Sequence, residues 1–459
     1  MIILKCAISL CVLLMIGCSA LPSGYQTTYG HPAGDLASVR IDGARGPLSV
    51  QQTREILAKL KKSGPETSIF ARHLALEEGI VGNPLTAGNK VTLLIDGPST
   101  YQSMFAAIEG AKDTINMETY SIEDDEVGCR FADALTNKQK SGVQVNLIYD
   151  SIGSHDTPSD FFKPLVDSGA HVLEFNPVNP FMLRKGWEAD RDHRKLLVVD
   201  GRIAFAGGIN ISSVYSSGSF SSSKPGRKDA QPWRDTHIRV EGPAVSEFQE
   251  FFLATWKKQK GEPLDRDRFF PPISNQGDEV VRAISSTPGN DYSPIYVTLI
   301  SAINSAETYA YITNAYFVPD PQLLAALEGA ARRNVDVRLL LPSKTDSKLV
   351  YYASRSYYDE LLSAGVKIYE RLDALLHAKT AVVDGVWSTV GSTNLDWLSM
   401  KLNQEINAVI LGRDFGSQMK TMFEKDMEAS RLVTLDEWRK RPIGPRIKEF
   451  AARLFSRWI

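Results

Sequence analysis

Cysteine is almost absent from the body of this chain. The sequence has 459 residues and four cysteines, and three of these, Cys6, Cys11 and Cys18, lie at the very start. Only Cys129 lies farther along, so a framework of disulfide bonds is excluded whatever the compartment.

A net charge of one sign is also lacking. Lys and Arg number 52 and Asp and Glu 54, which leaves a formal charge of −2. A near-neutral chain has no overall attraction to nucleic acid, although this does not exclude a local basic groove. The hydrophobic fraction of 43% is typical of a globular protein, and the length predicts two or more domain-sized units.

Long apolar runs are missing except near the N-terminus. Lys5 precedes the run CAISLCVLLMIG, which is too short for a comfortable membrane span and is typical of the apolar region of a signal peptide. The run ends at Gly17 and Cys18 and resembles a bacterial lipobox, in which the Cys is lipidated and the preceding peptide removed. Met15 departs from the usual Leu of that pattern.

We therefore expect residues 1–17 to be a lipoprotein-type signal peptide and Cys18 to carry the lipid. The alternatives are an ordinary signal peptide or a short uncleaved anchor. Ser19 is not the Asp that retains lipoproteins in the inner membrane, so the outer membrane stays open. Either membrane places the protein in the bacterial cell envelope, with a periplasmic catalytic body.

The rest of the chain divides into four parts. We predict a tether and N-terminal helical segment over 18–88, one αβ half over 89–265, a second over 266–428 and a basic amphipathic helix in 429–459. Both halves alternate strands and helices, and both end a helix at a glycine, Gly169 or Gly365. This pattern predicts an α/β (α+β) fold in which two mixed-sheet halves are related by a pseudo-twofold axis and share one active site.

One motif occurs once in each half. It reads His-x-Lys-x-x-x-x-Asp with an Asn 17 residues after the His, and its members are His193, Lys195, Asp200 and Asn210, then His377, Lys379, Asp384 and Asn394. Residues i and i+2 of a strand share a face, so the His and Lys of each copy point the same way. The Asp lies an odd number of residues after the His and the Lys, so it is expected on the opposite face of the strand. We interpret it as mainly structural.

Two His, two Lys and two Asn in one pocket suit phosphoryl transfer. One imidazole nitrogen attacks phosphorus to form a covalent phospho-enzyme, and the other imidazole moves the proton of the leaving and entering alcohols. The Lys and Asn groups donate to the phosphate oxygens, so no metal or other cofactor is expected. The acidic run 123–126 is interpreted as charge at a helix start rather than as a metal site.

A nucleophilic His needs one ring nitrogen held as a hydrogen-bond donor, and a carboxylate does this well. Asp235 in WRDTH and Glu405 in NQEIN are the candidates, the alternative for each being a solvated surface acid. His237 is interpreted as structural or supporting. Two insertions flank the first motif: an apolar and basic segment at 181–187 and a Ser/Gly/Lys-rich loop at 216–230, predicted to be mobile.

These residues resemble the phospholipase D superfamily, whose hallmark is the duplicated motif. The resemblance covers about 90–430 and implies that His193 is the nucleophile and His377 the acid and base. It implies that Asp235 and Glu405 orient the imidazoles. It also implies phosphate binding by Lys195, Asn210, Lys379, Asn394 and Ser392 of GSTN, a position that is Gly208 in the first copy.

Within the superfamily, the segments INMETYSIEDDEVG, HRKLLVVDGRIAFAGGIN and NAYFVPD resemble bacterial cardiolipin synthases of the C type. Ala315 departs from the Pro of many relatives. The resemblance implies a phosphatidyltransferase that moves a phosphatidyl group to phosphatidylglycerol, with phosphatidylethanolamine as donor, through a phosphatidyl-histidine intermediate.

Three alternatives stay open. Water as acceptor would make the same residues a phospholipase D hydrolase, although the apolar insertion at 181–187 favours a lipid alcohol. A nucleic-acid phosphodiesterase is disfavoured by the envelope-type N-terminus and the neutral charge. A non-enzymatic lipid-binding lipoprotein is disfavoured by two intact motifs.

The C-terminus carries a helical apolar stripe with cations beside it. The stripe is formed by Ile447, Phe450, Ala451, Leu454, Phe455 and Trp458, and Arg446, Lys448, Arg453 and Arg457 lie off it. Such a helix either lies in a membrane interface or docks on the catalytic body, and the pattern leaves both open. The expected partners are thus phospholipid substrates and a membrane surface, with no nucleic acid.

Because lysines and asparagines take the place of a metal ion in this scheme, phosphatidyl transfer is expected to survive EDTA. Turnover measured before and after chelation checks this. Full loss of activity that a divalent ion restores would contradict the metal-free scheme.

Overall fold

The computed structural model describes residues 39–62, 69–177, 190–217, 232–289 and 292–456. The predicted signal peptide, Cys18, the insertion at 181–187 and most of the loop at 216–230 lie outside the described residues.

The first half is one mixed sheet with helices on both faces. Its strands in spatial order are β6 (His171–Phe175), β5 (Gln144–Asp150), β4 (Thr114–Thr119), β8 (Lys195–Val199), β9 (Ile203–Gly207), β11 (His237–Glu241) and β3 (Leu85–Leu94). Its helices are α5 (Gly97–Gly110), α6 (Glu126–Lys140), α7 (Lys163–Asp167) and α8 (Val245–Lys258). β4, β5 and β6 are parallel, and β8, β9 and β11 run antiparallel to their neighbours.

The second half repeats this plan. Its strands in spatial order are β15 (Lys367–Arg371), β14 (Asp336–Pro342), β13 (Tyr309–Thr313), β17 (Thr380–Val383), β18 (Trp387–Gly391), β19 (Asn403–Leu411) and β12 (Glu279–Ser286). Its helices are α9 (Pro294–Ser305), α10 (Pro321–Arg332), α11 (Lys348–Arg355), α12 (Tyr358–Ser363), α13 (Trp397–Lys401) and α14 (Arg413–Glu428). β12 pairs with β3, which joins the two sheets. The predicted α/β duplication is confirmed.

Local sequence signals explain where the helices begin and end. The Asp125 carboxylate accepts hydrogen bonds from the backbone N–H groups of Val127 and Gly128 and caps α6, as the acidic run predicted. Gly169 and Gly365 follow α7 and α12 with φ of 91° and 98°, a conformation that glycine adopts without strain, and so they end these helices as predicted.

Three hydrophobic clusters hold the layers together. One lies under α5, α6 and α7 of the first half and one under α9, α10, α11 and α12 of the second. The third lies between the halves and combines Phe248 and Phe252 of α8 with Phe415 and Met419 of α14. This shared core fixes the two halves against each other, which a site assembled from both requires.

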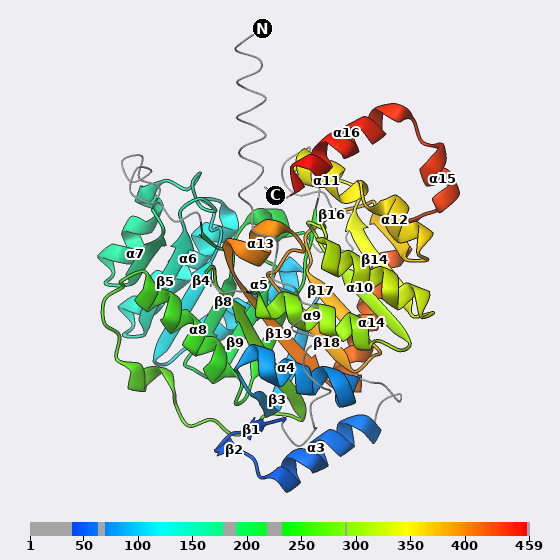
Figure 1. Cartoon of the computed structure of the whole chain (residues 1–459). Coiled ribbons are helices and arrows are strands. Elements are labelled where there is room, and N and C mark those ends of the chain that lie inside the picture. Colours follow the sequence, from blue (N-terminus) through cyan, green and yellow to red (C-terminus); the bar gives the residue numbers. More distant parts are fainter. Residues whose placement is uncertain (1–38, 63–68, 178–189, 218–231, 290–291, 457–459) are drawn as a thin grey trace.

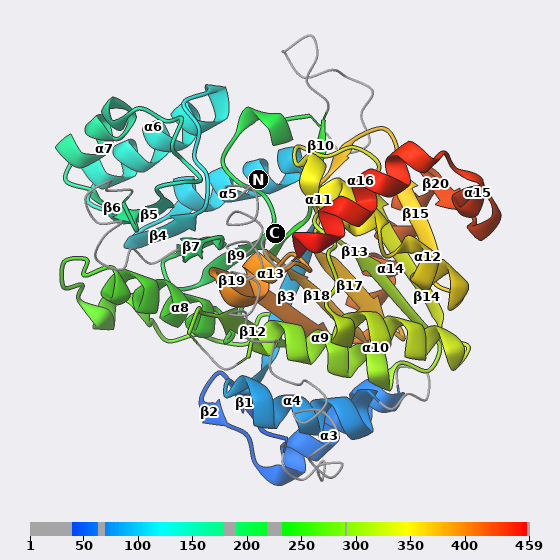
Figure 2. The same ribbon diagram turned by 45° about the horizontal axis from the view of Figure 1, so that its top comes forward.

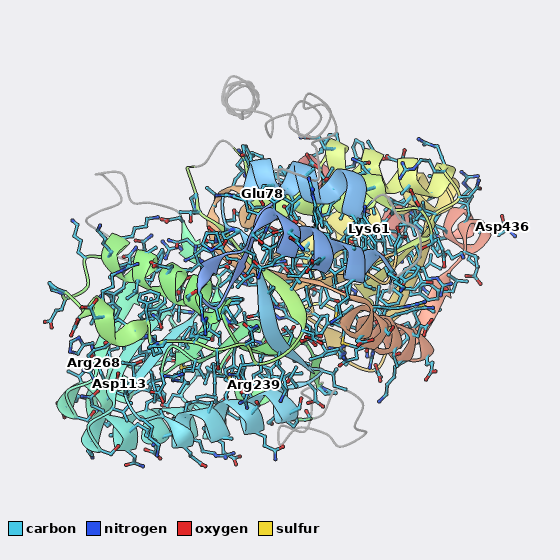
Figure 3. The ribbon with its side chains drawn as sticks, turned by 90° about the horizontal axis from the view of Figure 1, so that it is seen from below. Lys61, Glu78, Asp113, Arg239, Arg268 and Asp436 are labelled. Atoms are coloured by element: carbon cyan, nitrogen blue, oxygen red, sulfur yellow. The ribbon has the colours of Figure 1, made fainter. Side chains whose placement is uncertain are left out.

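The two ends of the molecule differ. β20 (Ser430–Val433), α15 (Leu435–Lys440) and α16 (Ile443–Leu454) complete the chain, and α16 lies beside α11 at the same end as α13 (Figures 1 and 2). β1 (Ile41–Gly43), β2 (Gly46–Pro47), α3 (Val50–Lys62) and α4 (Leu74–Val81) cover the opposite end. Figure 3 views that opposite end, with Lys61 of α3 and Glu78 of α4. Among the described residues, no helix combines the length and hydropathy of a membrane span.

The motif aspartates fasten the sheet to its helices. Asp200 accepts hydrogen bonds from the backbone N–H groups of Lys112, Asp113 and Thr114 at 2.8–2.9 Å, at the connection from α5 to β4. Asp384 accepts the equivalent three, from residues 307–309, at 2.8–3.0 Å. Both aspartates have φ of 51°. These contacts agree with the structural interpretation of the motif Asp.

Replacing Asp200 with Ala is expected to lower the free energy of unfolding by about 3 kcal/mol, because three N–H groups lose a charged acceptor and Ala tolerates positive φ poorly. Urea unfolding monitored by circular dichroism measures this. Asp278→Ala, at an exposed position, is the matched control and should change stability by less than about 0.5 kcal/mol. An equal effect at both positions would contradict the structural role.

Candidate active site

The two motif histidines lie where the halves exchange short strands. β7 (Arg191–Asp192) pairs with the start of β19, and β10 (Trp233–Arg234) pairs with β16 (Leu375–Leu376). The His193 N–H donates to the Gln404 carbonyl at 3.0 Å, and the His377 N–H donates to the Arg234 carbonyl at 2.8 Å. The backbone of each half therefore holds the motif His of the other.

The sheets bring these histidines to equivalent places. Lys195 pairs with Thr119 at the carboxyl end of β4, and Thr380 pairs with Thr313 at the carboxyl end of β13. Ligands of open α/β sheets bind beyond the carboxyl ends of parallel strands, so both motifs lie at the edge of the sheet where ligands normally bind.

The orienting carboxylates cross between the halves. His193 Nδ1 lies 3.0 and 3.1 Å from the two carboxylate oxygens of Glu405, and His377 Nδ1 lies 2.7 Å from Asp235 Oδ2. Both carboxylates are fully buried. A carboxylate can only accept, so each Nδ1 carries the proton and each Nε2 is left with a lone pair. The pattern predicted these two acids but not the crossing.

Burial sets the protonation of the histidines. It lowers the pKa of His193 to about 4, although Glu405 acts to raise it. It lowers the pKa of His377 as well, and there the nearby Lys379 adds to the effect. Burial alone would raise the pKa of Asp235, but Lys379 and His377 outweigh it, so this acid stays ionised. At neutral pH both histidines thus have unprotonated Nε2 atoms, and an ionised Asp235 lies beside His377.

Two lysines supply the positive charge. Lys195 Nζ donates to the His193 carbonyl at 2.6 Å, and Lys379 Nζ donates to the His377 carbonyl. Burial lowers the pKa of Lys195 to about 7 and of Lys379 to about 8, and the two ammonium groups repel each other. An anion between them would relieve this repulsion, so the pair is suited to a phosphate.

The side chains of the motif asparagines make no short hydrogen bonds to the described residues. The Asn210 side chain has two long contacts, 3.4 Å from Ser121 N to its Oδ1 and 3.3 Å from its Nδ2 to the Tyr215 hydroxyl. The Asn394 side-chain oxygen has no hydrogen-bond partner within the described part of the chain. Neither amide is tied up by a strong internal bond.

Ser392 supports one of the orienting carboxylates. Its hydroxyl donates to Glu405 and accepts from the Ile406 N–H at 3.0 Å, and it is fully buried. It thus holds the acid that orients His193, and its contact with the phosphate stays a prediction. In the first half a Cβ on Gly208 would lie 2.2 Å from Asp235 Oδ1, so the missing side chain makes room for that acid.

Aromatic side chains that the motif does not include lie around the two histidines. The Tyr120 ring lies 5.0 Å from the His193 ring, and the Trp233 and Tyr316 rings lie 5.1 and 6.2 Å from the His377 ring. The sequence duplication could have identified two of these residues, because Tyr120 and Tyr316 follow equivalent strands, β4 and β13. The Tyr215 hydroxyl lies 3.2 Å from His377 Nδ1.

The remaining candidate from the sequence, His237, has a structural role. His237 is fully buried and its Nδ1 accepts from the Ile209 N–H at 3.3 Å. Among the residues that the structure describes, no group of three or more His, Cys, Asp or Glu side chains is placed to hold a metal ion.

Comparison with known proteins matches this geometry. Residues 104–218 and 299–427 match a family model described as cardiolipin synthase, PLD-like domain. A cardiolipin synthase of Geobacillus kaustophilus is 36% identical over 386 residues, which span 83% of this chain and 75% of the relative. The major cardiolipin synthase ClsA of Bacillus subtilis is 36% identical over 375 residues, 81% of this chain and 76% of the relative.

This chain belongs to the cardiolipin synthase family of the phospholipase D superfamily. It is accordingly a phosphatidyltransferase that acts on phospholipids. A solved phosphatidylserine synthase of Haemophilus influenzae shares the fold, with a TM-score of 0.60 at 14% identity, covering 83% of this chain and 99% of that one.

Gly208 and Ser392 occupy equivalent positions in the two halves but differ in side chain. They therefore give a matched test of the carboxylates that cross between the halves. Gly208→Ala is expected to reduce phosphatidyltransferase kcat by at least 100-fold, because the new methyl group displaces the Asp235 carboxylate from His377. Ser392→Ala should cost about 10-fold, because Glu405 loses one supporting hydrogen bond of about 1.5 kcal/mol. Steady-state kinetics measures both, and circular dichroism checks folding. Wild-type turnover of a folded Gly208→Ala variant would contradict this geometry.

Proposed function

We propose that this protein makes cardiolipin, moving a phosphatidyl group from a donor phospholipid to phosphatidylglycerol through a covalent intermediate on His193. The observation that supports this most directly is the crossed arrangement, in which each imidazole keeps Nε2 free while a carboxylate of the other half holds Nδ1. The cardiolipin synthase relatives support the choice of product.

In the first step His193 Nε2 attacks the phosphorus of the donor. A P–N bond forms as the bond from phosphorus to the headgroup oxygen breaks. His377, protonated at Nε2 in the substrate complex, gives that proton to the leaving headgroup alcohol. Lys195 and Lys379 balance the charge that builds on the phosphoryl oxygens. The pKa of about 4 keeps His193 unprotonated and ready to attack.

In the second step the same groups work in reverse. His377, now neutral, takes the proton of a glycerol hydroxyl of phosphatidylglycerol as that oxygen attacks phosphorus. The P–N bond breaks, cardiolipin is released and His193 is restored. Asp235 stabilises the imidazolium of His377 in both steps through its 2.7 Å hydrogen bond.

We assign phosphatidylethanolamine as the donor, on the likeness of the quoted segments to synthases of the C type. We also place the enzyme in the bacterial cell envelope, lipid-anchored at Cys18, with a periplasmic catalytic body. The lipobox-like run ending at Cys18 supports that placement.

Lipid mass spectrometry tests the proposal. The full chain is incubated with vesicles of phosphatidylglycerol, with and without phosphatidylethanolamine, beside His193→Ala. Cardiolipin formed only by the intact enzyme, and in greater amount with phosphatidylethanolamine, is the expected result. Phosphatidic acid alone would make water the acceptor and replace the transferase with a hydrolase.

The same preparation locates the nucleophile. A donor with a p-nitrophenyl leaving group needs no proton from His377, so His377→Ala should accumulate a phosphatidyl adduct, which peptide mass spectrometry places on His193. His193→Ala should give none. An adduct on residue 377 in the His193→Ala variant would reverse the two roles.

A further inference from the structure

The C-terminal helix α16 packs on the catalytic body with its polar side. Glu449 is 2% exposed, pairs with Arg441 and lies 3.7 Å from Arg355 of α11. Arg453 Nη1 lies 2.7 Å from Glu360 Oε1 of α12. Ala452 is the buried apolar residue of this contact. Charged groups therefore hold the helix in place.

The apolar side of α16 points away from the body. Ile443, Ile447, Phe450, Leu454 and Phe455 are each 54–70% exposed. At 3.6 residues per turn Ile443, Ile447, Phe450 and Leu454 lie within about 60° of one another, on the kind of face that a helix of a globular protein normally buries. The sequence left open whether this helix docks on the body or meets a membrane; the structure shows a docked helix whose apolar stripe remains uncovered by the described residues.

Cations border the stripe on both sides. Arg446 and Lys448, both exposed, precede and follow Ile447, about 100° to either side of it around the helix. Lys448 Nζ lies 5.5 Å from the Tyr352 ring. An apolar face between two cations matches a phospholipid surface, whose acyl region takes the apolar side chains while its phosphates meet the ammonium and guanidinium groups.

The stripe lies at the end of the molecule that holds the active site. α16 packs on α11, which follows the carboxyl end of β14. Just before α11, Asp346 accepts from the Tyr316 hydroxyl at 2.6 Å, and the Tyr316 ring packs against His377. The helices α11 and α13 both lie at this end (Figure 2). Each adds an exposed apolar side chain, Leu349 and Leu398. α3 lies at the opposite end (Figure 1).

We propose that the exposed face of α16, formed by Ile443, Ile447, Phe450 and Leu454, docks on the phospholipid bilayer and sets the active-site end against it. The proposal goes beyond the transfer reaction and rests on it only for the choice of a lipid surface over a protein partner. The occupant is the bilayer interface, with anionic headgroups at Arg446 and Lys448.

Photo-crosslinking tests the contact without relying on activity. The full chain carries p-benzoylphenylalanine in place of Phe450 or, as the matched control, of Val50, which is 58% exposed on α3 at the other end. Vesicles of phosphatidylglycerol and phosphatidylethanolamine are added before irradiation. Lipid adducts at position 450 and at most one-tenth as many at 50 are expected. A band of doubled mass from position 450 would make a second copy the occupant, and equal lipid labelling at both positions would overturn the proposal.

Kinetics then tests what the contact does. The double variant Ile447→Glu with Phe450→Glu should lose at least tenfold in turnover on vesicles, yet keep wild-type turnover in detergent micelles, where substrate reaches the site without docking. Val50→Glu should match wild type in both. Unchanged turnover of the double variant on vesicles would contradict the role of α16. A wild type that is inactive both on vesicles and in micelles would instead refute the proposed function, and the crosslinking result would stand.

Discussion

The structure of this site depends on two hydrogen bonds that cross from one half to the other, from His193 to Glu405 and from His377 to Asp235. A fully buried carboxylate is costly unless it is hydrogen-bonded. Here Glu405 accepts hydrogen bonds from His193 and from the Ser392 hydroxyl. Asp235 accepts hydrogen bonds from His377 and, at 2.7 Å, from the Thr236 N–H. Each acid accepts from a donor of its own half and from the imidazole of the other half, so neither half alone can orient its own motif imidazole. The interdomain core and the exchanged strand pairs follow from that requirement.

The same burial shapes the electrostatics. Lys195 and Lys379 are both held out of water, which lowers the pKa of each, and Lys379 is close enough to lower the pKa of Lys195 further. Such a pair is unfavourable in the empty protein and becomes favourable when an anion arrives between the two ammonium groups. The chain thus places its desolvated cations where charge develops during phosphoryl transfer, and the protein need not reorganise at the moment of reaction.

The sequence predicts the features of the site that depend on local spacing, and it misses those that depend on how distant segments pack. The spacing of His193, Lys195 and Asp200 is local, so strand alternation suffices to separate the site residues from the structural Asp. The duplication then locates the second copy. The crossing of Glu405 and Asp235 depends on how two halves pack, which no local pattern encodes. The hydrogen bond from Ser392 to Glu405 was not predicted for the same reason, because it depends on how the ends of neighbouring strands pack.

The orientation of α16 is a clearer example of what a local sequence pattern cannot predict. An amphipathic pattern states that one face is apolar but not which face meets the body. The inverted docking becomes visible only when Glu449 is found between Arg441 and Arg355 and Arg453 beside Glu360. Buried ion pairs add little net stability compared with apolar packing, but their geometry is specific. A helix held by charge in one orientation can therefore keep its hydrophobic face for a second surface, and in a phosphatidyltransferase the surface nearest the substrate is the bilayer itself.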